Sequence, residues 1–209
     1  MIELSFAVLA SLFSLVNPLG AIPVFLAMTP HYTKQERAHT ALQTSLYFTL
    51  ILLAFYLGGT LILKFFGISL NAMQIAGGLV ILSSGFSLLN GKFAEGRTVN
   101  KKVKEEALTK DDISFSPLAM PLLSGPGSIS YLISLQAQHA AWEPRLLIGG
   151  VVIAMGAVVF LILRSSPYLH KLMGVAGLNA LSRIMGFLVM AIGIQNIIAG
   201  VVDLVKVLA

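Results

Sequence analysis

The sequence predicts an all-α membrane protein with six transmembrane helices, built as two inverted three-helix repeats with discontinuous helices 1 and 4. Two observations support this fold class. Hydrophobic residues make up 56% of the 209-residue chain and charged residues 11%, which is far more apolar than a soluble domain of this size can be. Long apolar runs follow one another along the chain, and the first and the fourth contain Pro and Gly near their centres.

Charged residues divide the chain into six apolar runs of roughly 18–25 residues, enough to cross a ~30 Å hydrocarbon core as helix. The expected spans are 4–28, 40–63, 70–89, 115–137, 146–163 and 178–201. Asn71 and Asn179 stand at the starts of the third and sixth spans, where we expect them to act as helix caps. We expect the first run to be retained as a membrane span. A cleaved signal peptide has basic residues before its apolar segment, whereas the charged residue that precedes this run is the acidic Glu3.

Residues 92–112 interrupt this pattern with 11 charged side chains, six basic and five acidic. We interpret them as a solvated loop that joins a first three-helix repeat, 1–91, to a second, 113–209. One side of the expected topology collects ten Lys and Arg residues together with Arg183, and the other side collects three. The positive-inside rule then makes the charged loop cytoplasmic and places both termini outside the cell (inner) membrane.

An internal repeat relates the two halves at a constant offset of 108 residues. Leu-Asn-Ala-Met at 70–73 matches Leu-Asn-Ala-Leu at 178–181. The same offset pairs Gly78 with Gly186, Gly85 with Gly193, and Pro18 with Pro126. A unit of three spans is odd in number, so its second copy enters the membrane upside down, as in many secondary transporters. The glycines predict a small-residue face for close helix packing.

The two Pro/Gly breaks predict a binding site near the middle of the membrane. A half-helix that starts at a break offers unpaired N–H groups, and one that ends there offers unpaired C=O groups. Together these groups suit the carboxylate and the ammonium of a small zwitterion. The candidate substrate-binding residues are Asn17, Pro18, Gly20, Ser124, Gly125, Pro126, Gly127 and Ser128. The competing interpretation is that the prolines only kink packed helices. The occurrence of two such breaks, related by the internal repeat and each with a Gly near its Pro, favours a binding site.

Gln195 and Asn196 lie deep in the sixth run and are candidates for interhelical hydrogen bonds or for the substrate pathway. Residues for other chemistries are lacking. The chain has no Cys, its four His fall at span ends or in loops, and no Asp or Glu lies inside an expected span. We therefore expect no enzyme activity, no cofactor and no metal site. The basic residues form no nucleic-acid-binding stripe.

At these motifs the chain resembles the MarC family of six-span membrane proteins. The matching stretches are Asn17-Pro18-x-Gly20-x-x-Pro23, Ile75-Ala76-Gly77-Gly78, Pro117-Leu118-Ala119-x-Pro121, Gly125-Pro126-Gly127 and Arg183-Ile184-x-Gly186. The resemblance implies a bacterial or archaeal multi-pass protein of the inner membrane. It also implies similarity to transporters of small neutral amino acids such as glycine and alanine, and more distantly to LysE-type amino-acid exporters.

We therefore predict a secondary transporter that moves small neutral amino acids across the lipid bilayer by alternating access. The alternatives are a membrane protein with a structural or assembly role, an exporter of another small solute, and a passive channel, for which the sequence offers no continuous polar stripe. The coupling ion, Na+ or H+, and the oligomeric state are left open at this point.

Overall fold

The protein is built from helices in every part that the computed structural model describes, which is residues 2–91, 113–139 and 141–208. These helices are α1 (Ile2–Val16), α2 (Pro18–Met28), α3 (Lys34–Phe65), α4 (Leu70–Leu89), the irregular η1 (Ser114–Leu123), α7 (Pro126–Gln138), α8 (Trp142–Arg164) and α9 (Ser166–Leu208). Five segments are long and apolar enough to span a membrane, or six if η1 and α7 form one span. The predicted all-helical membrane fold is confirmed, whereas the predicted loop at 92–112 lies outside the described residues.

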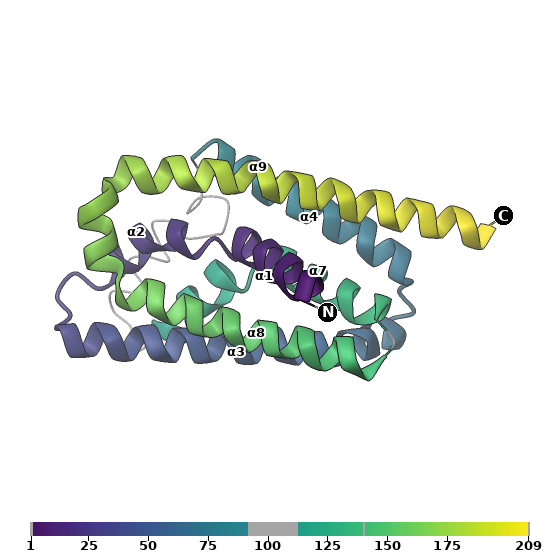
Figure 1. Ribbon diagram of the computed structural model, residues 1–209, viewed down its shortest axis with the longest axis horizontal. Helices are drawn as coiled ribbons and strands as arrows, with labels where there is room; N and C mark the ends of the chain where they lie inside the picture. The colour runs from purple at the N-terminus through teal and green to yellow at the C-terminus, as the bar shows by residue number, and fades with distance from the viewer. Residues whose placement is uncertain (1, 92–112, 140, 209) are drawn as a thin grey trace.

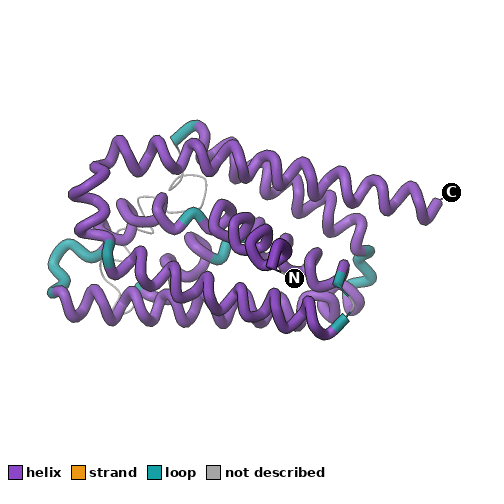
Figure 2. Tube along the Cα trace, in the orientation of Figure 1, coloured by secondary structure: helices purple, strands orange, loops and turns teal. Residues whose placement is uncertain are grey.

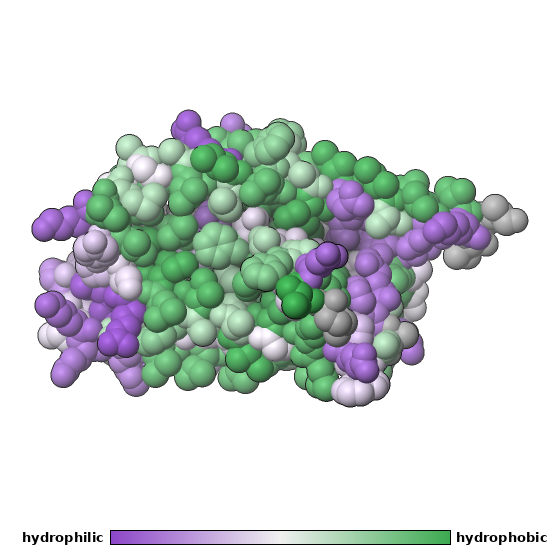
Figure 3. All heavy atoms as spheres, viewed as in Figure 1, coloured by the Kyte–Doolittle hydropathy of each residue, from purple (hydrophilic) through white to green (hydrophobic). Residues whose placement is uncertain are grey.

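The long helices run side by side along one common axis (Figures 1 and 2). The C-terminal part of α9 and the α3–α4 turn lie at one end of this bundle, which we call the terminal end. The α2–α3 loop and the α8–α9 junction lie at the opposite end. A hydrophobic band separates two hydrophilic ends in Figure 3. Large apolar side chains such as Leu57 and Ile153 are exposed, which suits contact with lipid tails.

The first apolar run changes helix at Asn17. Helix α1 ends at Val16 and α2 begins at Pro18, because proline has no N–H group to continue the hydrogen-bond ladder of α1. Asn17 between them is left-handed, with φ 48° and ψ 61°, a conformation that Asn tolerates better than most residues do. Its side-chain Oδ1 accepts a hydrogen bond from the Gly20 N–H at 3.3 Å, so this residue also caps the start of α2.

The fourth apolar run bends by 66° between η1 and α7. Helix η1 contains two prolines, and its backbone is extended rather than helical at Ser116 and at Met120. Both deviations fall one residue before a proline, where a clash with the proline ring disfavours helical geometry. Helix α7 then begins at Pro126, whose fixed φ suits the first position of a helix.

Each apolar run packs against the run that lies three further along the chain. Helix α3 contacts α8, and α4 makes the most extensive contact of all with α9. In the two runs that change helix, α1 contacts α7 and α2 contacts η1. The first half of one such run therefore lies beside the second half of the other, so the two runs are antiparallel.

The contact between α4 and α9 is made by the predicted small-residue face. A carbon added at Gly78 would lie 2.7 Å from the backbone oxygen of Gly193, and one added at Gly193 would lie 2.9 Å from that of Gly78. Gly85 and Gly186 face each other in the same way, at 2.8 Å and 3.0 Å. Backbones approach this closely only where side chains are absent. The predicted packing role of these four residues, the glycine seam, is confirmed.

Two helix starts differ from the sequence-based expectation. Helix α4 is capped by the hydroxyl of Ser69, which accepts a backbone N–H at 3.2 Å, so Asn71 lies inside the helix. Helix α9 begins at Ser166 and is divided by a left-handed residue, Gly174 with φ 63°, so Asn179 is not a cap either. The first part of α9 crosses the end of the bundle in Figure 1. Hydrophobicity marks the part of a helix that spans the membrane, and caps mark its ends.

Replacing Gly193 by Leu should force α4 and α9 apart. The first added carbon would lie 2.8 Å from the backbone nitrogen of Leu82, and overpacking of this kind typically costs about 1–3 kcal/mol. We expect a lower melting temperature in detergent, measured by differential scanning fluorimetry. Gly149→Leu on α8 is the matched control, because nothing lies within 4 Å of a carbon added there. Equal melting temperatures for the two variants would contradict the role of the seam.

Candidate functional site

Asn17 fills the junction between α1 and α2. It is fully buried, and its backbone N–H donates to the carbonyl oxygen of Phe13 at 2.9 Å. Its amide nitrogen Nδ2 has no hydrogen-bond partner within the described residues. Gly20 brings this junction against α9, since a carbon added at Gly20 would lie 2.7 Å from the Ser182 hydroxyl. The first junction therefore keeps one unused donor at its contact with α9.

Residues Ser124 to Ser128 form the junction between η1 and α7. Ser124 is 1% exposed, and its hydroxyl has no partner in the part of the chain that the structure describes. The Ser128 hydroxyl donates to the carbonyl oxygen of Gly125 at 2.9 Å and is thereby satisfied locally. Gly127 lies against Ile81 on α4. This second junction keeps one unused hydroxyl.

The two junctions contact different helices: the first contacts α9 and the second contacts α4. These two helices pack against each other at the glycine seam. Pro18 and Pro126 are the first residues of α2 and α7. The structure therefore connects the two predicted halves of the site through α4 and α9. The side-chain groups Asn17 Oδ1 and Ser128 Oγ are satisfied locally, so the junctions alone offer fewer free groups than the sequence suggested.

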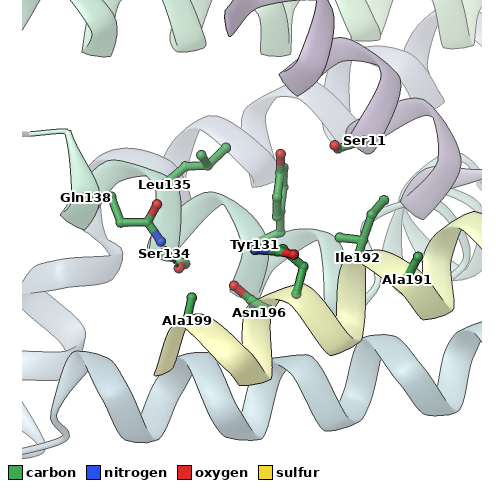
Figure 4. A pocket seen from close by; sticks show the side chains of 10 residues that line it. Ser11, Tyr131, Ser134, Leu135, Gln138, Ala191, Ile192, Asn196 and Ala199 are labelled. Atoms are coloured by element: carbon green, nitrogen blue, oxygen red, sulfur yellow. Dashed lines mark hydrogen bonds between the residues drawn. The ribbon is translucent and has the colours of Figure 1, made fainter. Parts of the chain in front are cut away.

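A polar cavity of about 470 Å³ lies between α1, α7 and α9 (Figure 4). Its lining residues Ser11 and Tyr131 stand within about two helical turns of Asn17 and Pro126 along the chain. Six polar side chains line it, namely Ser11, Tyr131, Ser134, Gln138, Gln195 and Asn196. Figure 4 shows Gln138 and Ser134 together on α7 and Asn196 across from them on α9. Gln138 Nε2 donates to the Ser134 hydroxyl at 3.0 Å. Gln138 and Gln195 are exposed, whereas Ser134 and Asn196 are buried, so the cavity leads inward from the surface.

Asn196 on α9 lines this cavity, and two further buried polar residues, Gln74 on α4 and Ser130 on α7, lie at the neighbouring contacts between these helices; we call the three residues the amide cluster. A carbon added at Gly77 would collide with the Ser130 hydroxyl and lie 3.8 Å from Asn196 Nδ2. Gln74 is one turn before Gly77 and lies against Gly200 on α9. Neither polar atom of Gln74, nor Ser130 Oγ, nor Asn196 Nδ2 has a partner among the described residues.

The unused groups of the amide cluster are neutral donors and acceptors. A buried polar group without a partner costs about 1–3 kcal/mol, so the cluster destabilises the empty protein and gains when a polar molecule binds. Amide nitrogens donate, amide oxygens accept, and a hydroxyl does both. Groups of these two kinds bind carboxylates and ammonium ions respectively. Within the described residues no group of three or more His, Asp or Glu side chains could hold a metal ion.

The structure places both predicted pathway residues, Gln195 and Asn196, in the cavity wall. Sequence reasoning missed the other polar groups of the wall and of the amide cluster. Those on α7 carried a signal, because polar residues recur there at helical spacing, at Ser130, Ser134 and Gln138. Gln74 carried none, since it is a single amide in an apolar run.

Helical membrane spans that enclose a neutral polar cavity define a multi-pass integral membrane protein. The chain belongs to the MarC family, because the model of the MarC family integral membrane protein matches residues 2–205. The predicted family is therefore confirmed. No solved structure matches the chain.

Curated relatives cover nearly the whole chain. It is 40% identical over 188 residues to the UPF0056 membrane protein BU267 of Buchnera aphidicola, an alignment that covers 90% of this chain and 87% of the relative. It is 38% identical over 201 residues to the UPF0056 membrane protein MJ1677 of Methanocaldococcus jannaschii, covering 95% and 97%. It is 39% identical over 193 residues to the UPF0056 membrane protein YhcE of Escherichia coli, covering 91% and 88%.

Replacing Gln74 by Met should preserve or raise stability. The change removes a buried amide without partners while keeping a similar volume, and relief of such a group amounts to roughly 1 kcal/mol. The melting temperature in detergent measures the effect. Gln43→Met is the matched control, because Gln43 Oε1 accepts a hydrogen bond from the Ser114 hydroxyl at 3.2 Å and its loss should destabilise. A larger loss of stability in Gln74→Met than in the control would contradict the unpaired state of Gln74.

Proposed function

We propose that this MarC family protein is a secondary transporter of small neutral amino acids, with its substrate site in the polar cavity and the amide cluster. One observation carries the proposal: a cavity of about 470 Å³ is lined by the buried Asn196, whose Nδ2 has no partner among the described residues and lies beside Gly77 together with the unpaired Ser130 hydroxyl. Small-molecule sites have volumes in this range. An α-amino acid brings a carboxylate for the donors and an ammonium for the acceptors, and glycine or alanine adds little bulk.

The helix junctions extend this site. Asn17 Nδ2 and Ser124 Oγ are buried and unpaired within the described residues, and α7 starts at the second junction with N–H groups and the positive end of its dipole. We infer that a substrate passes from the cavity to these groups on its way through the protein. The predicted break residues then contact the substrate at a later stage than the amide cluster does.

We further propose that 1–91 and 113–209 are inverted repeats that rock against each other. The glycine seam supports this, because exchanging each residue for its counterpart 108 positions away turns the Gly78–Gly193 pair into the Gly186–Gly85 pair. A contact that maps onto itself in this way is the isologous contact of a two-fold axis. The absence of side chains at the seam allows one helix to slide or rotate on the other, which alternating access requires.

Five of the six polar lining residues of the cavity belong to the second half, 113–209, and Ser11 is the exception. The residues 108 positions before Tyr131, Ser134, Gln138 and Asn196 are Pro23, Leu26, Pro30 and Leu88. A substrate that approaches from the terminal end therefore meets amides and hydroxyls, and one at the equivalent place in the other half meets apolar groups. This difference supports substrate entry from the terminal end.

If transport is coupled to an ion, the ion must bind to groups within the spans that are not carboxylates. The described acidic residues, Glu3, Glu36, Glu143 and Asp203, stand near helix ends, so they offer no carboxylate relay inside the spans. Amide and hydroxyl oxygens of the cavity can ligate Na+. We therefore include a sodium gradient and a proton gradient as separate arms of the transport test.

Proteoliposomes with the purified protein should accumulate labelled alanine or glycine under at least one of these gradients. Ser130→Ala and Asn196→Leu should each lower uptake about tenfold or more, because a hydrogen bond to a charged group contributes about 1.5–3 kcal/mol. Ser84→Ala is the matched control, since the Ser84 hydroxyl donates within its own helix to the Val80 oxygen at 3.0 Å.

Two outcomes would contradict the transport proposal. One is wild-type protein that takes up neither amino acid under any gradient and gains no thermal stability from either, which would favour a structural or assembly role. The other is uptake that is equal in Ser130→Ala, Asn196→Leu and the control, which would move the site away from the amide cluster.

We also propose that the terminal end faces outward, because Lys34, Arg37, Arg164 and Lys171 lie at the opposite end of the bundle and basic residues favour the cytoplasm. The chain has no Cys, so the labelling of a single introduced Cys reports on which side of the membrane that residue lies. Gln138→Cys should react with a membrane-impermeant maleimide on intact cells. Lys171→Cys should react only after permeabilisation. The reverse pattern of labelling would invert the topology.

A further inference from the structure

A second cavity, of about 460 Å³, lies at the opposite end of the bundle, between the start of α3, the end of α8 and the start of α9. We call it the basic cavity, because its charged lining residues are Lys34, Arg37 and Arg164 and it has no acidic lining residue. Tyr168, Pro167 and Ala38 supply part of the remaining wall. It lies apart from the polar cavity and has no part in the proposed binding of amino acids.

The three bases of this cavity have no acidic partner within the described residues. Arg37 is held in place by Thr29, since its Nε donates to the Thr29 hydroxyl at 3.2 Å and its Nη2 donates to the Thr29 carbonyl oxygen at 2.7 Å. Arg164 stacks over the Phe160 ring, 5.7 Å from its centre. The nearby acid Glu36 is occupied by the Thr33 N–H at 2.7 Å. Three positive charges that share one concave surface favour the binding of an anion there.

The position of the basic cavity in the bundle indicates which anion. Leu161 lies one turn from Arg164, and Leu42 one turn from Ala38, and both leucines are exposed. Tyr168 is 69% exposed at the rim, as tyrosines commonly are where a protein meets lipid headgroups. Figure 3 shows the hydrophilic end giving way to the hydrophobic band at this end of the bundle. The cavity therefore lies at the depth of the headgroups.

We propose that the basic cavity binds the phosphate of an anionic phospholipid headgroup. Guanidinium groups contact phosphate oxygens through paired N–H donors, and the lysine adds a mobile charge. Basic cavities between transmembrane helices are suited to such headgroups. The exposed Leu42 and Leu161 beside the cavity offer apolar contact to acyl chains, which favours a lipid over free phosphate. Because α3 and the α8–α9 junction belong to different halves of the chain, a bound lipid touches both halves.

Native mass spectrometry of the detergent-purified full chain tests this proposal with two lipids of identical acyl chains, phosphatidylglycerol and phosphatidylcholine. We expect phosphatidylglycerol adducts at concentrations where phosphatidylcholine gives few. The double variant Lys34→Gln/Arg164→Gln should bind phosphatidylglycerol about tenfold or more weakly, since each base near the membrane surface contributes several-fold in affinity. The charge-conserving variant Lys34→Arg/Arg164→Lys should keep most of the binding, which separates loss of charge from loss of fold.

Lys171→Gln is the matched control, because Lys171 lies at the same end of the bundle on α9 but does not line the basic cavity. Its phosphatidylglycerol binding should equal that of the wild type. Equal binding of the two lipids, or an equal loss in the control and the double variant, would overturn the proposal. Displacement of phosphatidylglycerol by millimolar inorganic phosphate would also overturn it in favour of a soluble anion. None of these outcomes depends on transport activity.

Discussion

A bilayer offers no water to a broken helix, so every interruption at membrane depth must be enclosed by protein. Two runs of this chain change helix inside the bundle, at Asn17 and between η1 and α7. The pairs α3–α8 and α4–α9 each contact both of these runs. The glycine seam makes the α4–α9 pair close enough to support one junction on each of its helices, through Gly20 on one side and Gly127 on the other. The seam is therefore the contact on which the candidate site depends.

The chemistry of the site follows from its neutrality. A charged side chain at this depth would be costly to bury, whereas amides and hydroxyls are cheaper and still provide donors and acceptors. Gln74, Ser130 and Asn196 remain unpaired within the described residues, so the protein carries a cost of a few kcal/mol that a bound zwitterion can relieve. Under the proposed function, an uncharged cavity of this kind would recognise a molecule that bears two charges, and the bulk of the molecule rather than its charge would limit which substrates enter.

The two ends of the bundle differ in their polar chemistry. The terminal end holds the neutral cavity between α1, α7 and α9, and the opposite end holds the basic cavity between α3, α8 and α9. Helix α9 contributes to both, and the left-handed Gly174 separates its short first part from the long part that carries Asn196. The solute and the lipid headgroup that we propose would therefore bind to different groups of the protein and would not compete.

Composition and charge spacing alone determined the membrane fold class, and the positions of Pro and Gly marked where α1 gives way to α2 and η1 to α7. These are local properties of the chain, as is the glycine spacing that foretold the seam. The helix caps at Ser69 and the start of α9 were missed, because apolar runs do not reveal helix ends. Only the tertiary structure brought Gln74 and Ser130 to Asn196, from three helices far apart in sequence. Such convergence depends on the rotation and register of packed helices, which side-chain contacts across the whole bundle set and no single segment encodes.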